Sequence, residues 1–365
     1  MMKYRFMRVL SGAVLGLLTL VSAADEAAYR AMFLGDVHYD AAEYHPGEKA
    51  KASSRRTVKM WKKASPQLLK AASDEAAKEN VAFVVQLGDL TQGGADTPEL
   101  QEKMLRIAFP TLKQYFPDRQ LLVVKGNHDV FVKNDRNDNG PAERGLLPPV
   151  AAELGVPKLA DGNYTFRRGK DLYIAADGFV GGKTTVEFVR KALAENPDAR
   201  YVFFMTHLPI LPSSAKGPVW LLPDYEEIAA MLETRKALVI AAHTHRPSLT
   251  TRTTPRGTIP QLVVASLGSY WHPDKLVPDP LTDWEKFVAA AQKVKLVGRN
   301  TRVPKELPRI MAMGTYTHRR DFSNSGFAIL DVDDTGVTAR VFTNMSGTPS
   351  VTLKLIDGPA AQSAK

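Results

Sequence analysis

The chain has 365 residues, with 48 lysines and arginines against 39 aspartates and glutamates, and a formal net charge of +9. This mild basic excess suits an anionic substrate or a cell-envelope setting. It is equally compatible with the surface charge that keeps ordinary proteins soluble. No run of basic residues interleaved with aromatics indicates a nucleic-acid groove, so no nucleic-acid polymer is expected as a partner. The chain has no cysteine, so disulfides are excluded and the fold must rely on its core.

The N-terminus predicts a secretory signal peptide over residues 1–23. Lys3, Arg5 and Arg8 precede the apolar run Val9–Val21, and a small-residue cleavage site ends at Ala23. The run is shorter than the roughly 20 residues that span a bilayer. We therefore expect a secreted or periplasmic mature protein with no membrane span after cleavage, and an uncleaved anchor is the alternative.

Strand-like and helix-like segments alternate through the first third of the chain. Apolar runs predict strands, and helical periodicity separates them, giving the order strand Arg30–Leu34, helix Thr57–Lys78, strand Val81–Leu87, helix Pro98–Phe116 and strand Leu121–Lys125. This alternation predicts parallel strands. The polar stretch Tyr39–Arg56 is interpreted as a loop over the carboxyl ends of the strands. Asn134–Gly140 is interpreted as a loop as well, because it lacks the acid at the twelfth position of a calcium-binding loop.

The rest of the chain predicts two sheets. A hairpin is expected around Gly169, from 163–168 and 172–176, followed by helix Thr184–Glu195, strand Tyr201–Met205, helix Tyr225–Thr234 and strand Ala237–Ala241. From Gln261 the pattern turns to β, with strands predicted at 261–265, 327–332, 337–342 and 351–355. The predicted fold class is α/β, with two mixed sheets packed face to face and helices outside.

Five short segments directly after apolar runs carry side chains that bind transition metals through nitrogen and oxygen. The segments are GDVH at 35–38, GDL at 88–90, GNHD at 126–129, THLP at 206–209 and HTH at 243–245. The metal-ligand candidates are Asp36, His38, Asp89, Asn127, His207, His243 and His245. Open α/β sheets place their sites at the carboxyl ends of strands, so these side chains are expected to converge. A ligand set without thiolate suits Mn, Fe, Zn or Co rather than a structural zinc site.

With these motifs the chain resembles the calcineurin-like metallophosphoesterases, whose pattern runs DxH, GDxx, GNH, a lone His and GHxH. The pattern runs from Asp36 to His245. The resemblance covers the catalytic core and the closing strands, but not the stretch around residues 270–320, and it implies a four-layer α/β/β/α sandwich. Thr206 stands where Gly or Ala usually precedes the lone His, and Ala242 replaces the Gly before His243. Gln92 stands where many members carry an acid that pairs with the catalytic histidine.

The resemblance implies two metal ions that share one bridging ligand. One ion is expected to bind Asp36, His38 and His245. The other is expected to bind Asn127, His207 and His243. Asp89 would bridge them, because a carboxylate can bind one ion with each oxygen. Two such ions can hold a water between them and lower its pKa enough to give hydroxide near neutral pH.

The implied reaction is hydrolysis of a phosphate monoester or diester by that hydroxide. His128 lies next to the ligand Asn127 and is expected to protonate the leaving group, since histidine titrates near neutral pH. Asp129 is a candidate partner of His128, although a structural turn contact is the favoured interpretation of Asp129. Arg246 and His272 are the candidates for contacting substrate. The alternatives are a nucleotidase or cyclic-nucleotide phosphodiesterase, with Trp271 stacking on the base, and a metal-binding protein without turnover.

Since the metal-ligand candidates are spread over more than two hundred residues, residues 24–365 are predicted to form one domain with an insertion at about 270–325. The insertion is rich in proline, tryptophan and basic residues, and Asp283–Leu296 within it is predicted to be helical. Two interpretations remain: a lid or substrate-binding subdomain, and a surface insertion that packs on the core.

Overall fold

The structure is a computed structural model that describes residues 28–46, 52–133, 136–213, 221–268, 277–278, 283–293, 302–320, 322–343 and 347–358. The predicted signal peptide and the candidates Trp271 and His272 lie outside the described residues. Within the described ranges no helix is both long enough and apolar enough to cross a membrane.

The first sheet has six strands in the order β17-β16-β15-β1-β2-β3. The three strands predicted first, β1 (Tyr29–Leu34), β2 (Phe83–Gln86) and β3 (Gln120–Val123), run parallel to one another. The C-terminal strands β15 (Phe327–Asp333), β16 (Gly336–Phe342) and β17 (Val351–Asp357) are antiparallel to their neighbours. The predicted parallel βαβαβ arrangement is therefore confirmed, and the sheet as a whole is mixed.

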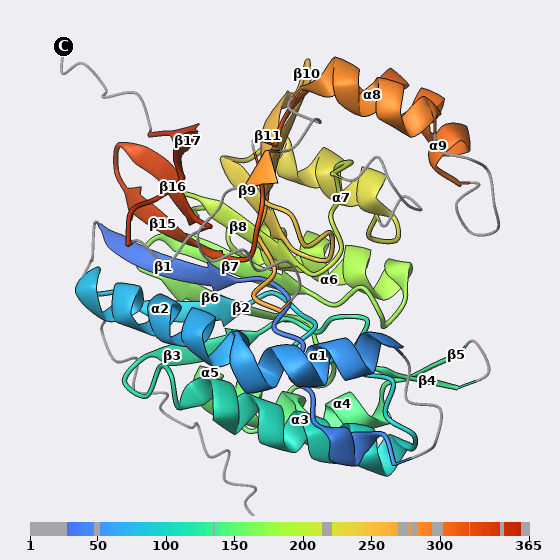
Figure 1. Ribbon diagram of the computed structural model, residues 1–365. Helices are drawn as coiled ribbons and strands as arrows, with labels where there is room; N and C mark the ends of the chain where they lie inside the picture. Colours follow the sequence, from blue (N-terminus) through green and yellow to red (C-terminus); the bar gives the residue numbers. More distant parts are fainter. Residues whose placement is uncertain are drawn as a thin grey trace, which may run out of the picture.

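Helices cover the outer face of this sheet (Figure 1). They are α1 (Ala52–Lys63), α2 (Ser65–Lys78), α3 (Pro98–Lys113), α4 (Gly140–Gly145) and α5 (Leu147–Leu154). The single helix predicted over Thr57–Lys78 is wrong in two respects. Its first part begins already at Ala52, and it is interrupted at Ala64, because Pro66 has no N–H to continue the helical hydrogen bonds. The predicted loop Tyr39–Arg56 thus contains a short 3-10 helix, Ala42–Tyr44, and the start of α1.

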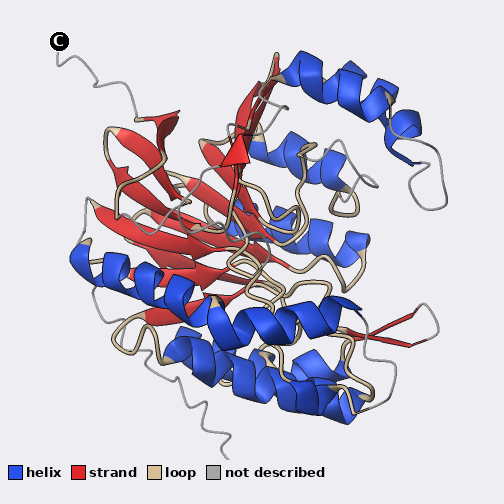
Figure 2. Ribbon diagram, viewed as in Figure 1, coloured by secondary structure: helices blue, strands red, loops and turns tan. Residues whose placement is uncertain are grey.

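The second sheet has seven strands in the order β13-β10-β11-β9-β8-β7-β6. These are β6 (Tyr164–Arg168), β7 (Asp171–Ala176), β8 (Val202–Thr206), β9 (Ala237–Ala241), β10 (Ser248–Thr254), β11 (Gly257–Val263) and β13 (Thr315–Arg319). The hairpin around Gly169 is confirmed as β6–β7. Helices α6 (Gly182–Glu195) and α7 (Tyr225–Leu232) cover the outer face, and Figure 2 shows the strands gathered between two sets of helices.

The core of the molecule lies between the two sheets. In β7 the side chains of Tyr173 and Ala175 face the first sheet, where the Tyr173 ring lies 5.1 Å from that of Phe83. The alternating Leu172 and Ile174 pack instead with α6 and α7. Successive side chains of a strand point to opposite faces, so a strand buried on both faces is apolar throughout. The four-layer α/β/β/α architecture is confirmed.

Several elements were not predicted. The interpretation of Asn134–Gly140 as a loop is wrong in part, because Arg136–Asp138 forms β5, which pairs with β4 (Phe131–Lys133) in a short hairpin. In the described part of 270–325, α8 (Trp284–Gln292) lies within the predicted helix, and α9 (Arg302–Ala312) is additional. A two-stranded pair joins β12 (Val277–Pro278) and β14 (Phe322–Ser323).

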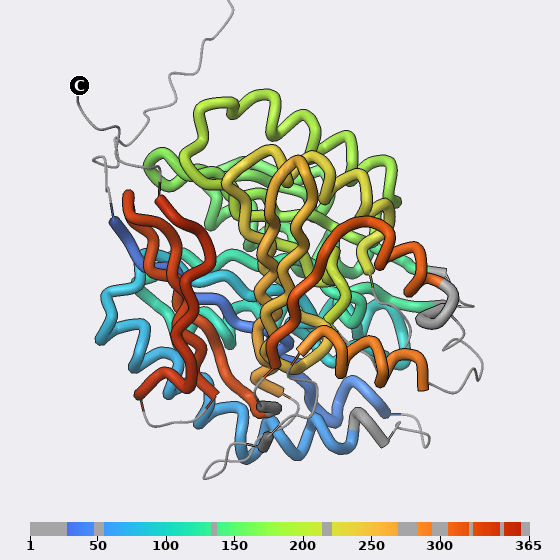
Figure 3. Tube along the Cα trace, turned by 90° about the horizontal axis from the view of Figure 1, so that it is seen from above, coloured from blue at the N-terminus to red at the C-terminus, as the bar shows by residue number. Residues whose placement is uncertain are grey.

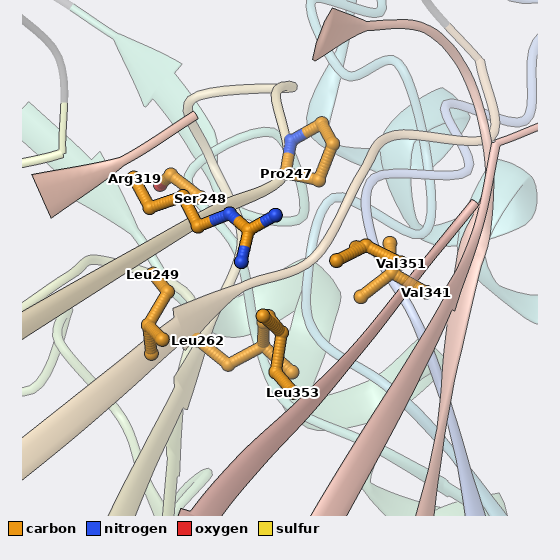
Figure 4. Close-up of a pocket in the computed structure, with 8 residues that line it drawn as sticks. All are labelled: Pro247, Ser248, Leu249, Leu262, Arg319, Val341, Val351 and Leu353. Atoms are coloured by element: carbon orange, nitrogen blue, oxygen red, sulfur yellow. The ribbon is translucent and has the colours of Figure 1, made fainter. Parts of the chain in front are cut away.

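The described part of the insertion packs along the edge of the second sheet. Strand β13 pairs with β10, and the Trp284 ring of α8 stacks on Tyr316 of β13 with centroids 4.7 Å apart. In Figure 3 the red strands β15–β17 lie to one side of the orange β10–β11 hairpin. Between these two groups a cavity of about 20 Å³ is lined mainly by apolar side chains, and Arg319 reaches into it (Figure 4). Its volume suffices for about one water molecule.

Candidate metal centre

The structure brings all seven metal-ligand candidates together at the carboxyl ends of five strands. Two groups of side chains have ligand atoms within 4.8 Å of one another. The first group is Asp36, His38, Asp89 and His245. The second group is Asp89, His207 and His243. Asp89 therefore belongs to both groups, which is the arrangement needed for a carboxylate shared by two ions.

In the first group the donor atoms of three side chains face one another. Nε2 of His38 lies 3.3 Å from Nε2 of His245, and Nε2 of His245 lies 3.3 Å from Oδ1 of Asp36. Asp36 is fully buried, and its Oδ1 atom has no hydrogen-bond partner among the described residues. A buried carboxylate oxygen without a hydrogen bond is costly, and a bound cation removes that cost. The donor set of this group therefore fits a divalent ion.

The second group adds the amide of Asn127. Nε2 of His207 lies 3.3 Å from Oδ2 of Asp89, 3.0 Å from Oδ1 of Asn127 and 3.1 Å from Nδ1 of His243. The other ring nitrogen of His207 contacts the carbonyl oxygen of Leu87 at 2.9 Å. A carbonyl can only accept, so Nδ1 carries a proton and Nε2 is the atom available to a metal ion.

The backbone at the site is held in a conformation that most residues avoid. His38, Asp89, His243 and His245 have φ angles between 52° and 67°, in the left-handed region. Two glycines in the motifs let the loops approach this closely. A Cβ on Gly88, whose φ is 92°, would lie 2.6 Å from Nδ1 of His207, and a Cβ on Gly126 would lie 2.0 Å from the backbone nitrogen of Asp89.

Burial and neighbouring charges set the protonation of the ligand candidates. Burial lowers the pKa values of His38 and His243 to about 3, which keeps both rings neutral as metal binding requires. Burial alone would raise the pKa of Asp36 and lower that of His207. The opposite charges outweigh burial, so the pKa of Asp36 falls to about 2 beside His245, and that of His207 rises to about 9 beside Asp89. The site thus favours charged carboxylates and a protonated His207, so an ion that binds Nε2 of His207 must displace the proton from that nitrogen.

His128 lies beside the two groups and outside both. Its backbone N–H donates to Oδ1 of Asp89 at 2.8 Å, and its ring packs edge-on against His38 with centroids 5.0 Å apart. Nδ1 of His128 is hydrogen-bonded to the backbone carbonyl oxygen of Gln92. Nε2 of His128 lies 3.9 Å from Oδ2 of Asp89, and the side chain is 35% exposed. The partner of His128 is therefore the backbone carbonyl of Gln92, where the family pattern led us to expect an acidic side chain. Every residue has such a carbonyl, so the identity of residue 92 could not reveal this contact.

Asp129 has the structural role that the sequence favours. Its carboxylate accepts hydrogen bonds from the backbone N–H groups of Leu90, Thr91 and Gly126 at 2.9–3.3 Å. These contacts tie the GDL and GNHD loops together. Of the two substrate candidates, Arg246 is partly exposed directly after His245, and His272 lies outside the described residues.

The chain is similar to known phosphoesterases. The sequence profile of the calcineurin-like phosphoesterases matches residues 29–247, and no curated protein matches. A dimetal phosphatase from Danio rerio has 14% sequence identity and a TM-score of 0.51, over 90% of this chain and 99% of that one. A purple acid phosphatase from yellow lupin (Lupinus luteus) has 12% identity and a TM-score of 0.52, over 91% of this chain and 54% of that one. At such low sequence identity, these two structures show only that the fold is similar.

The profile, by contrast, spans more than half of the chain and includes all five motifs, from Asp36 to His245. The protein therefore belongs to the calcineurin-like phosphoesterase family and is a metal-dependent phosphoesterase.

Proposed function

We propose that this phosphoesterase holds two divalent ions and uses them to hydrolyse a small phosphate monoester or diester. The observation that carries the proposal is the sharing of Asp89 by two groups of ligand atoms. A single ion would leave one of these groups of buried carboxylate and imidazole unused. The absence of thiolates from both groups favours Mn, Fe, Zn or Co.

Each ion has its own set of side chains in this proposal. The first is held by Asp36, His38 and His245. The second is held by Asn127, His207 and His243. When bound, the two ions would activate a water molecule for attack on phosphorus and neutralise charge on the phosphate oxygens.

The proposal assigns proton donation to His128. Because the carbonyl oxygen of Gln92 accepts from Nδ1, that nitrogen keeps its proton and Nε2 is the atom that donates to the leaving-group oxygen. The His128 side chain is partly exposed, as a residue that contacts a substrate must be. The Gln92 carbonyl is neutral, so it orients the His128 ring without placing a negative charge next to Nδ1. The orientation of His128 therefore needs no acidic partner at residue 92.

Replacing His128 with alanine tests this role against metal binding. The variant is expected to retain both ions and to lose rate on alkyl phosphate esters by about 10²–10⁴-fold, the usual contribution of a general acid. A nitrophenyl ester, whose leaving group is already stable as an anion, is expected to lose much less. His207→Ala is the matched control, since it removes a proposed ligand and should lose one ion and slow both substrates together. Equal losses on both esters, or loss of metal from His128→Ala, would exclude His128 as the acid.

A direct assay tests whether the protein turns over substrate at all. Protein loaded with Mn²⁺ is expected to hydrolyse a generic aryl phosphate, and a screen of monoesters against diesters then identifies the substrate class. Metal binding without turnover of either class would favour a binding protein over an enzyme.

The proposed setting is outside the cytoplasm. A basic n-region, an apolar run and a small-residue cleavage site over residues 1–23 support export. Residues 24–365 would then form one domain with the insertion at about 270–325.

A further inference from the structure

Helix α1 contacts the loop that carries Asp36 and His38 at two points. The contacts come from Thr57 and Trp61, which are four residues apart. Residues at this spacing lie on the same face of a helix. Figure 1 shows α1 beside the loops that leave the first sheet. One face of one helix therefore contacts the ligand-bearing loop twice.

The first contact fixes the backbone of His38. The indole Nε1 of Trp61 donates to the carbonyl oxygen of His38 at 2.6 Å, and the backbone N–H of His38 donates to the carbonyl oxygen of Asp89 at 2.9 Å. Both backbone polar groups of His38 are thus engaged while its φ angle is 52°. A left-handed conformation in a non-glycine residue persists when its surroundings hold it in place.

The second contact fixes the chain two residues further on. Asp40 is only 3% exposed, and its two carboxylate oxygens have separate partners. Oδ2 accepts from the Thr57 hydroxyl at 2.7 Å, and Oδ1 contacts Nε2 of the buried His45 at 2.8 Å. A buried carboxylate with both oxygens bound has little freedom to move. The loop is therefore held to α1 at His38 and at Asp40, and Asp40 in turn contacts His45.

We propose that Thr57, Trp61 and Asp40 are positioning residues for the metal ligand His38. Through the backbone they set the direction of the His38 ring, and so the affinity of the ion held by Asp36, His38 and His245. Their hydrogen bonds given above for the described residues go to the His38–His45 loop and not to Asn127, His207 or His243. The other ion is linked to that loop through the shared Asp89, so its affinity should change less. This inference rests on the proposed two-ion function.

Outer partners of metal ligands typically contribute 10–100-fold to metal affinity, which gives the expected size of the effect. Trp61→Phe removes the indole N–H but keeps an aromatic ring beside Tyr39, whose ring centroid lies 4.9 Å from that of Trp61. Thr57→Val removes the hydroxyl at nearly constant volume, and Thr57→Ser keeps it.

The experiment is a titration of metal-free protein with Mn²⁺ that resolves the affinity of each ion. Trp61→Phe and Thr57→Val are each expected to weaken the binding of one ion by about 10-fold or more and to weaken the binding of the other much less. Activity lost at limiting Mn²⁺ should return when Mn²⁺ is raised. Thr57→Ser and the distant control Trp284→Phe, in α8, should keep both affinities. Melting of the metal-free variants shows whether the fold is intact.

Two outcomes would overturn the inference without contradicting the proposed function. In the first, Trp61→Phe and Thr57→Val leave the affinities of both ions unchanged. In the second, they weaken both ions equally. A wild-type protein that binds a single ion would instead overturn the proposed two-ion function, and this inference with it.

Discussion

The buried ion pair between Lys125 and Asp177 allows a quantitative test of the fold around the site. Lys125 follows β3 and Asp177 follows β7, so the pair joins the two sheets. Nζ of Lys125 lies 2.6 Å from Oδ2 of Asp177 and donates to Oδ1 of Asn139 at 2.8 Å. The side chains of Lys125 and Asp177 are 2% and 0% exposed. Replacing Lys125 with methionine keeps an apolar stem of similar length and leaves the carboxylate of Asp177 buried without its counter-charge.

Removing one partner of a buried pair costs about 3–5 kcal/mol. With an unfolding entropy of about 2.1 cal/mol/K for each residue, a folded chain of roughly 330 residues should melt about 4–7 °C lower. The assay is thermal unfolding of the metal-free protein, so that changes at the metal centre do not contribute.

The matched control is Lys70→Met. Lys70 forms an ion pair with Asp74 at the same distance, 2.6 Å, but the two side chains are 70% and 63% exposed. Exposed pairs contribute about 0–1 kcal/mol, so this control should shift the melting temperature by less than about 1.5 °C. Equal shifts in the two variants would refute the reasoning, because the pairs differ in burial rather than in separation.

The same variant has an expected pH dependence. Burial raises the pKa of Asp177, and Lys125 partly offsets this, so losing Lys125 raises the folded-state pKa further above the unfolded value of about 3.9. A carboxyl whose pKa is raised by folding stabilises the folded state at low pH, and this contribution is lost as pH rises through the folded-state pKa. The deficit of Lys125→Met relative to wild type should therefore be larger at pH 8 than at pH 5. A deficit that grows towards acid pH would contradict this sign.

Three further predictions concern the site and the N-terminus. Asp89→Asn should remove most of both ions in metal analysis, because one carboxylate serves two ions; a single tightly held ion that this change does not affect would disprove the shared ligand. Gly126→Ala should weaken metal binding, since the added Cβ would lie 2.0 Å from the backbone nitrogen of Asp89 and force that loop to move; unchanged metal content would show that the loops can relax. Sequencing of the exported protein should begin near Ala24, whereas Met1 on a cytosolic product would rule out the predicted signal.

Much of the site could be predicted because its side chains follow strands with a strong apolar pattern. The runs before Asp36, Asp89 and His207 are buried on both faces, so their hydrophobicity is continuous and easy to recognise. Elements with a weaker pattern were missed. Strand β10, with the sequence SLTTRTT, has a largely polar composition, and its threonines fit a strand only through their branched side chains and cross-strand partners.

Contacts made through the backbone could not be predicted from the sequence either. The carbonyl oxygen of Gln92 bonds to His128, and the carbonyl oxygen of His38 accepts from Trp61. Every residue has a carbonyl group, so the sequence carries no mark of which one is used. Predicting these contacts requires the path of the loops, which depends on how α1 and the two sheets pack.

The left-handed backbone of the four proposed ligands has a consequence for engineering the protein's heat resistance. A non-glycine residue in this region costs of order 1–3 kcal/mol, although aspartate and histidine tolerate it better than most residues. The loops at His38, Asp89, His243 and His245 therefore store strain that the rest of the fold must offset. A search for thermostable variants should recover changes to glycine or asparagine at these positions, and those variants would gain stability as they lose metal. Selection by melting temperature alone would thus favour inactive proteins, so any such screen needs metal retention as a second criterion.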